Sequence, residues 1–189
     1  KHLSVMGIVG IIASNMDKML VFHFLGAAPV AVYTLAQLPS TQILKMFSLA
    51  GSLVFPKFAQ RNLSALRETL THKIYVFSFA TIAVVALYIT LSPYIFKLIF
   101  PMYQEAVFLS QILILAVLTK PFTLYAQVFA AHGLKRAQYF TQISVAIIKL
   151  SLLLVLLPLY GLWGAVWTTL ATSIYWSIIV AVLFYRRKV

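Results

Sequence analysis

The chain contains no cysteine, which excludes disulfide bonds, thiolate metal sites and cysteine nucleophiles. Acidic residues are scarce, with 3 Asp and Glu against 15 Lys and Arg in 189 residues, giving a formal net charge of +12 at pH 7. Charged residues make up only 10% of the chain, whereas soluble domains carry about a quarter. With 62% hydrophobic residues and a mean hydropathy of +0.98, the sequence excludes a soluble domain and indicates an integral membrane protein.

Several functional classes are excluded by missing motifs. No Gly-rich phosphate loop is present, so the chain should have no ATPase activity of its own and no nucleotide cofactor. The 4 histidines stand apart from one another and from carboxylates, which argues against a metal site. Although the chain is basic, its Lys and Arg residues are not gathered on a soluble face, so we do not expect nucleic acid as a partner.

The long apolar runs predict membrane-spanning helices, because one span needs about 20 mostly apolar residues. Strands are a poor alternative, since the runs are continuous rather than alternating. We expect an all-α integral membrane protein, with residues 1–189 forming one six-helix transmembrane lobe. Residues 56–73 form the one long predicted loop, with a brief amphipathic helix on the membrane surface. The six predicted spans are residues 3–24, 30–55, 74–96, 106–131, 138–158 and 162–184.

The basic residues between the spans predict the orientation of the chain. Ten of them fall on one side of the membrane and one, Lys97, falls on the other. Because cytoplasmic loops carry the excess of Lys and Arg, we expect both ends of the chain to be cytoplasmic. The chain starts with Lys1 inside a span, which suggests a truncated N-terminus. The ten residues are Lys1, Lys57, Arg61, Arg67, Lys73, Lys135, Arg136, Arg186, Arg187 and Lys188.

Polar residues also lie within the spans, where an ionisable group is costly and usually functional. On the second span they recur at steps of three or four residues, which places them on one helix face. Similar spacing groups two residues on the fourth span, where Pro121 predicts a kink. The candidate substrate-binding residues are Gln37, Thr41, Lys45, Lys120, Gln127 and Lys149.

Asp17 is the only carboxylate within a predicted span. Its neighbour Lys18 points to a different helix face, so we expect Asp17 to pair with a lysine of another helix, or to act as a coupling residue. Such a pair neutralises one deep lysine and leaves a net-cationic interior that suits an anionic substrate such as a pyrophosphate. Helix packing and purely structural roles are the alternative interpretation of these polar residues.

Four short motifs in order resemble the second lobe of polysaccharide exporters in the multidrug/oligosaccharidyl-lipid/polysaccharide (MOP) superfamily, the Wzx-type O-antigen flippases. No single motif is specific, but their order extends over nearly the whole chain. They are Asn-Met-Asp-Lys at 15–18 with Val-Tyr at 32–33, Phe-Pro-Lys-Phe-Ala at 55–59, His-Gly-Leu-Lys at 132–135, and Pro-Leu-Tyr-Gly-Leu-Trp-Gly-Ala at 158–165.

The resemblance implies a MATE-like transporter with two lobes, of which this chain is the C-terminal one and lacks its N-terminal partner lobe. It implies export of an undecaprenyl-pyrophosphate-linked oligosaccharide across the bacterial inner membrane, among membrane lipids, for O-antigen, capsule or other lipopolysaccharide and surface polysaccharide biosynthesis. A drug/cation antiporter of the same superfamily and a lipid II flippase are the alternatives. A membrane enzyme such as a polymerase would require a large charged outer loop, which the chain lacks, so no catalytic residues are expected.

Overall fold

The computed structural model describes residues 15–59, 63–131 and 133–186, and these are helical almost throughout, with no strand among them. A first helix at residues 15–25 leads into long helices joined by short turns. The remaining elements are α2 (Ala27–Ala59), α3 (Leu63–Ile99), the short 3-10 helix η1 (Pro101–Tyr103), α4 (Glu105–Leu113), the 3-10 helix η2 (Ile114–Phe122), α5 (Thr123–Ala131), α6 (Lys135–Tyr160) and α7 (Leu162–Arg186).

Four segments of the described chain are long and apolar enough to cross a membrane: His72–Ile99, Glu105–Ala130, Arg136–Tyr160 and Leu162–Arg186. Each has at least 25 residues, a length of about 38 Å that exceeds the hydrocarbon core of about 30 Å. They correspond to the third to sixth predicted spans. Most of the first predicted span lies outside the described residues.

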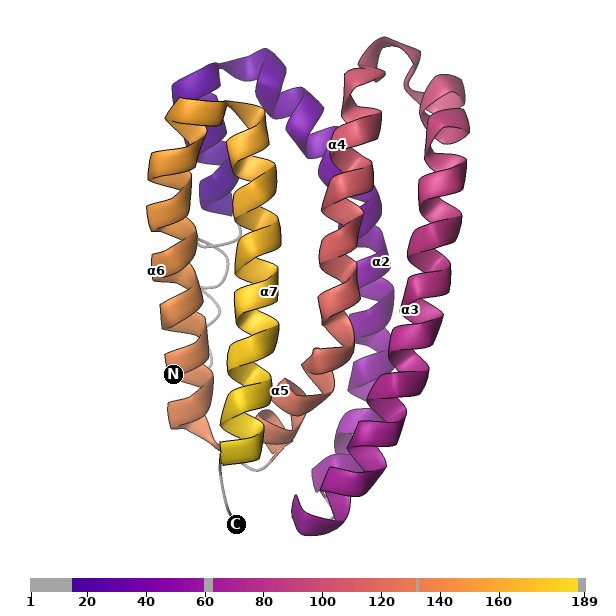
Figure 1. The fold of residues 1–189 in the computed structure, drawn as a ribbon, viewed down its shortest axis with the longest axis vertical. Coiled ribbons are helices and arrows are strands. Elements are labelled where there is room, and N and C mark those ends of the chain that lie inside the picture. Colours follow the sequence, from indigo (N-terminus) through magenta and orange to yellow (C-terminus); the bar gives the residue numbers. More distant parts are fainter. Residues whose placement is uncertain (1–14, 60–62, 132, 187–189) are drawn as a thin grey trace.

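The second predicted span behaves differently. Helix α2 has 33 residues, but it is not among the four segments, because its polar residues lower its hydropathy. Pro39 lies in its first half and has no N–H to bond to the Leu35 carbonyl, which gives the helix a physical reason to bend. In Figure 1 the first turns of α2 cross one end of the molecule before the helix runs down beside α3 and α4.

The long loop predicted at residues 56–73 is not present as such. Helix α2 continues to Ala59, and α3 begins at Leu63 and continues into the span. The charged residues in this stretch therefore mark the end of the apolar sequence, but they do not mark the end of the helices, which continue into the charged stretch.

The fourth predicted span consists of three successive elements, α4, η2 and α5. Nine residues of 3-10 helix separate the two α-helices, an unusual length for this tighter helix. Pro121 lies near the end of η2 and removes one backbone donor at that point. In Figure 1 the chain leaves the axis of α4 and turns beneath α7, so α5 contacts both α6 and α7.

Helix α3 also contains a proline within its span, and the Ser92 hydroxyl of α3 together with one side chain of the next helix compensates for it. Pro93 cannot donate to the Ile89 carbonyl. The amide nitrogen of Gln111 on α4 donates to that carbonyl at 3.2 Å and to the Ser92 hydroxyl at 3.0 Å. These bonds hold α3 and α4 together in addition to their apolar contacts.

The turns between helices depend on glycine at specific positions. Gly26, Gly133 and Gly161 all have positive φ, at 87°, 64° and 57°, a region that favours glycine. Gly164 at the start of α7 is different, because a Cβ built there would overlap the backbone of Leu156 in α6. Its lack of a side chain allows α6 and α7 to approach closely.

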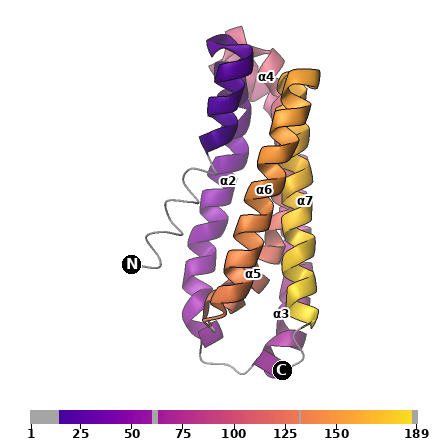
Figure 2. The ribbon, with the colours of Figure 1, turned by 90° about the vertical axis from the view of Figure 1, so that its left-hand side faces the viewer.

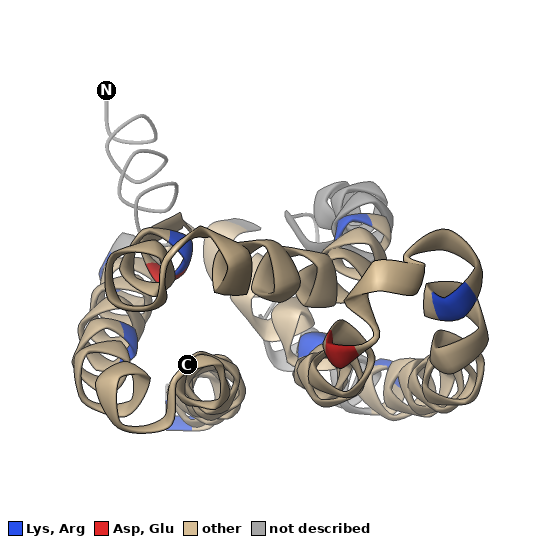
Figure 3. Ribbon diagram, turned by 90° about the horizontal axis from the view of Figure 1, so that it is seen from above, with Lys and Arg blue, Asp and Glu red and all other residues tan. Residues whose placement is uncertain are grey.

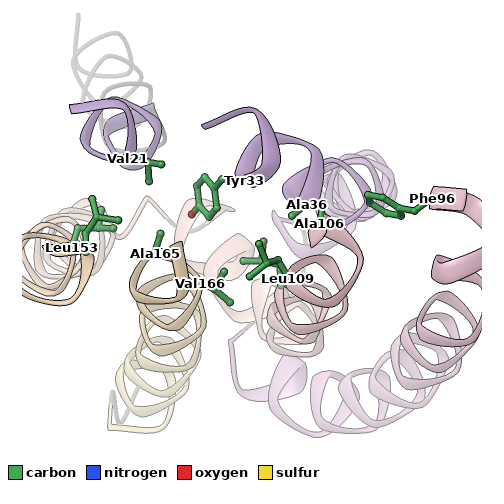
Figure 4. Packing of buried hydrophobic residues seen from close by; sticks show 11 residues of the cluster. Val21, Tyr33, Ala36, Phe96, Ala106, Leu109, Leu153, Ala165 and Val166 are labelled. Carbon is green, nitrogen blue, oxygen red and sulfur yellow. The ribbon is translucent and has the colours of Figure 1, made fainter. Parts of the chain in front are cut away.

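The largest buried cluster lies at the end of the bundle where α2 crosses. Figure 4 shows the Tyr33 ring beside Val21 and Ala165, with Leu153 of α6 farther away in the same cluster, while Ala36 lies near Ala106. The start of α2 thus joins helix 15–25, α6 and α7 to α4. A second cluster at the opposite end combines α5 with the end of α7, where the rings of Tyr125 and Phe184 stack at 4.4 Å.

Many large apolar side chains lie on the outer surface. Large hydrophobic side chains are exposed along every long helix, including Phe79 at 77%, Leu98 at 85% and Leu159 at 71%. Seen from above in Figure 3, charged positions are few among the helices. A soluble monomer rarely exposes such a surface, and the fold is therefore that of a multi-pass membrane protein.

Candidate functional site

The most deeply buried charge in the described chain is Asp17, whose exposure is only 3%. Its Oδ2 atom lies 3.4 Å from the Nζ atom of Lys149 on α6. The Tyr33 hydroxyl donates to the same oxygen at 3.3 Å, and the Gln37 amide donates to it at 3.2 Å. The backbone N–H of Lys18 donates to Oδ1 at 3.1 Å, so both carboxylate oxygens have partners.

The hydrogen bonds continue from Asp17 to a fourth helix. The Tyr33 hydroxyl lies 3.1 Å from the hydroxyl of Thr169 on α7, and Thr169 donates to the Ala165 carbonyl at 3.0 Å. We call Asp17, Tyr33, Gln37, Lys149 and Thr169 the Asp17 cluster. It joins helix 15–25, α2, α6 and α7 through one carboxylate and one phenol.

The local sequence explains how these groups meet. Gly26 turns the chain between helix 15–25 and α2, which returns α2 toward Asp17. Tyr33 and Gln37 are four residues apart and therefore lie on one face of α2. In Figure 2 helix 15–25 lies beside the upper part of α6, the helix that contributes Lys149. The lysine partner expected for Asp17 is thus Lys149.

Lys149 also lines a recess on the side of the bundle. The recess has a volume of about 160 Å³ and is formed by Lys149 with five apolar residues: Met16, Ala146, Ile147, Leu150 and Leu153. The lysine side chain is 19% exposed, against 4% for Asp17. One lysine therefore contacts the buried carboxylate and an accessible apolar surface.

Lys120 has a different environment. It lies in η2, and its Nζ atom is 5.5 Å from the centre of the Trp176 ring on α7, within the range of a cation–π interaction. Two turns further along, Gln127 is half-buried and its Oε1 atom is buried without a hydrogen-bond partner among the described residues. An acceptor in that state favours any ligand that supplies a donor.

The other two candidates on α2 do not join the Asp17 cluster. The Thr41 hydroxyl donates to the Leu38 carbonyl of its own helix at 2.8 Å, and Lys45 is exposed. The stripe predicted from Gln37 through Lys45 is therefore divided, with only Gln37 bonded to Asp17. The three lysines Lys45, Lys120 and Lys149 have separate environments on α2, η2 and α6.

Sequence reasoning missed two members of the Asp17 cluster. Tyr33 precedes Gln37 by four residues, and this spacing was a usable signal for a shared helix face. Thr169 lies in a run of small and hydroxyl residues on α7, where nothing in the sequence distinguishes it. Within the described ranges, no three His, Asp or Glu residues come close enough to hold a metal ion.

Comparison with known proteins identifies no relative, since no family model, no curated protein and no solved structure matches the chain.

Proposed function

We propose that this chain is one six-helix lobe of a two-lobe flippase of the MOP superfamily. Its substrate would be an undecaprenyl-pyrophosphate-linked oligosaccharide, moved from the cytoplasmic to the outer leaflet of the bacterial inner membrane. The apolar helices support a membrane location, and the four motifs and the deep lysines support this class of transporter rather than an enzyme.

The observation that carries the proposal is the pairing of Lys120 with Trp176 inside the bundle. An ammonium group within a membrane helix is costly to bury and is a suitable point charge for a pyrophosphate. The neighbouring indole ring offers an apolar face, and the unpartnered Oε1 of Gln127 accepts a hydrogen bond from a sugar hydroxyl. Together these groups match the charged and the hydroxyl-rich parts of a lipid-linked saccharide.

The arrangement of the bundle is compatible with the proposed orientation. The ends of α2 and α7 and the starts of α3 and α6 lie at one end in Figure 1, and the turns next to η1 and Gly161 lie at the other. The first group carries the excess of basic residues. By the positive-inside rule this end would face the cytoplasm. In a two-lobe transporter of this class, an N-terminal partner lobe would complete the transport cavity.

The buried Asp17 makes a drug/cation antiporter of the same superfamily the second candidate, because a deep carboxylate can exchange protons or attract a cation. Lys149 already neutralises this carboxylate, so the Asp17 cluster presents no net negative charge to a cationic drug. A lipid II flippase shares the pyrophosphate chemistry, and the groups around Lys120 fit that substrate equally well.

The test replaces Lys120 in the full-length protein and measures surface polysaccharide in cells that lack the wild-type gene. Lys120→Met should abolish export, while Lys120→Arg should retain part of it, because the charge is kept. Lys97→Met, at the predicted outer end of α3, is the matched control and should export normally. Membrane levels of each variant are measured by immunoblot. Wild-type export by Lys120→Met at normal protein levels would contradict the proposal.

A further inference from the structure

Lys149 lies between two possible anionic partners, one inside the protein and one outside it. Its ammonium group contacts the Asp17 carboxylate at 3.4 Å, and its side chain also lines the apolar recess between helix 15–25 and α6. The recess suits a hydrocarbon chain, and an anionic headgroup on that chain would reach the lysine. Building on the proposed function, we propose that Lys149 exchanges Asp17 for the phosphate of the lipid substrate when Asp17 takes up a proton.

Charge balance couples proton uptake by Asp17 to binding of the anion. With Asp17 ionised, the pair is neutral, and an incoming phosphate would add an uncompensated negative charge in a region of low dielectric constant. With Asp17 protonated, Lys149 would be a half-buried cation without the Asp17 charge, which is also unfavourable. Uptake of one proton together with one negative charge keeps the cluster neutral, so each ligand favours binding of the other.

The hydrogen bonds around Asp17 can serve both protonation states without moving an atom far. In the ionised state the Tyr33 hydroxyl donates to Asp17 Oδ2. When Oδ2 carries the proton, it donates to the Tyr33 oxygen instead, Tyr33 donates to Thr169, and Thr169 donates to the Ala165 carbonyl. Every hydroxyl then has one acceptor, so the reversed chain stabilises the neutral carboxyl group.

No other described group competes for this role. The ionisable side chains facing Asp17 are Tyr33 from α2 and Lys149 from α6. Helix α7 contributes the neutral Thr169 through Tyr33. On its own helix, Lys18 contacts Asp17 through the backbone N–H. Proton uptake coupled to anion binding is therefore assigned to Asp17.

The test measures anion binding against pH with the full-length protein in nanodiscs. The probe is farnesyl methyl phosphodiester, whose single negative charge stays constant from neutral to mildly acidic pH. We expect wild-type affinity to rise as the pH falls, by up to about tenfold per pH unit for one linked proton. Asp17→Asn should bind tightly at all pH values without this slope, and Lys149→Met should bind at least tenfold more weakly throughout.

Two control variants and an infrared measurement distinguish a specific loss of binding from misfolding of a variant. Lys149→Arg keeps the cation and should keep the pH slope, and Glu105→Gln removes an exposed carboxylate and should behave as wild type. In wild-type protein, infrared difference spectra should show a protonated carboxyl band appearing on probe addition, and Asp17→Asn should lack it.

The outcomes separate this inference from the proposed function. An unchanged pH slope in Asp17→Asn, or absence of the carboxyl band in wild type, would overturn the exchange. If in addition Lys120→Met abolishes binding, the proposed pyrophosphate-lipid function stands without the exchange. If the probe binds to no variant at any pH while the protein remains folded, both the function and the exchange are refuted.

Discussion

Removing Lys149 while leaving Asp17 in place should destabilise the bundle strongly. At 3.4 Å and an effective dielectric constant of about 20, the attraction between the two charges is about 5 kcal/mol. Lys149→Met leaves the carboxylate almost fully buried with neutral donors only. Loss of one partner of a buried pair costs about 3–5 kcal/mol, and we expect a loss in the lower part of that range because Tyr33 and Gln37 still donate to the carboxylate.

The double variant Asp17→Asn/Lys149→Met separates the charge effect from packing. It removes both charges and keeps an acceptor for Tyr33 and Gln37, so it should lie within about 1 kcal/mol of wild type. Stability is measured by reversible unfolding in mixed micelles, followed by tryptophan fluorescence. A change of no more than about 0.6 kcal/mol in Lys149→Met, the average for polar contacts in membranes, would show that the ion pair does not stabilise the fold. The same conclusion would follow if the loss of unfolding free energy in the double variant equalled the sum of the losses in the two single variants.

Three further substitutions probe separate contacts. Gly164→Ala should lower the free energy of unfolding by about 2 kcal/mol in the same assay, because the new Cβ forces α6 and α7 apart. The control Ala171→Val, on the exposed face of α7, should change this free energy little, and equal effects of the two substitutions would contradict the close approach of α6 and α7. Gln111→Leu should cost about 1 kcal/mol, since the Ser92 hydroxyl loses its donor and the Ile89 carbonyl keeps only the bond from Ser92. An unchanged free energy of unfolding would contradict this role of Gln111. Tyr33→Phe should cost about 2 kcal/mol through loss of its bond to the buried carboxylate, and its stability loss should shrink once that carboxylate is replaced by an amide.

The sequence was informative where a single residue limits the possibilities. Asp17 is the only carboxylate in a predicted span, and its neighbour Lys18 lies on a different helix face, so a lysine of another helix was the expected partner. Which lysine it meets depends on how helix 15–25 lies against α6, and this packing is not encoded in any local pattern. Lys149 was expected to line the substrate cavity, and this stays a prediction. The structure places its ammonium group 3.4 Å from Asp17 and its side chain in the wall of the recess.

Helix ends were harder to predict than spans. Hydropathy marks where a chain leaves the lipid and does not mark where a helix ends, which is why residues 56–73 were expected to form a loop although α2 and α3 extend into them. Pro121 signalled a break in the fourth span, but nine residues of 3-10 helix before it could not be read from spacing. Helix α2 shows a different difficulty. Its polar residues lower its hydropathy, so the segment predicted as the second span is not among the four apolar helices long enough to cross a membrane.

If this protein moves a lipid-linked oligosaccharide outward, as proposed, deleting its gene in the source cell should stop that movement. The measurement is the leaflet on which lipid-linked oligosaccharide accumulates, read from its accessibility to an impermeant glycan-modifying reagent. We expect accumulation on the cytoplasmic leaflet and loss of surface polysaccharide. Normal surface polysaccharide, with no accumulation and no second flippase in the cell, would contradict it.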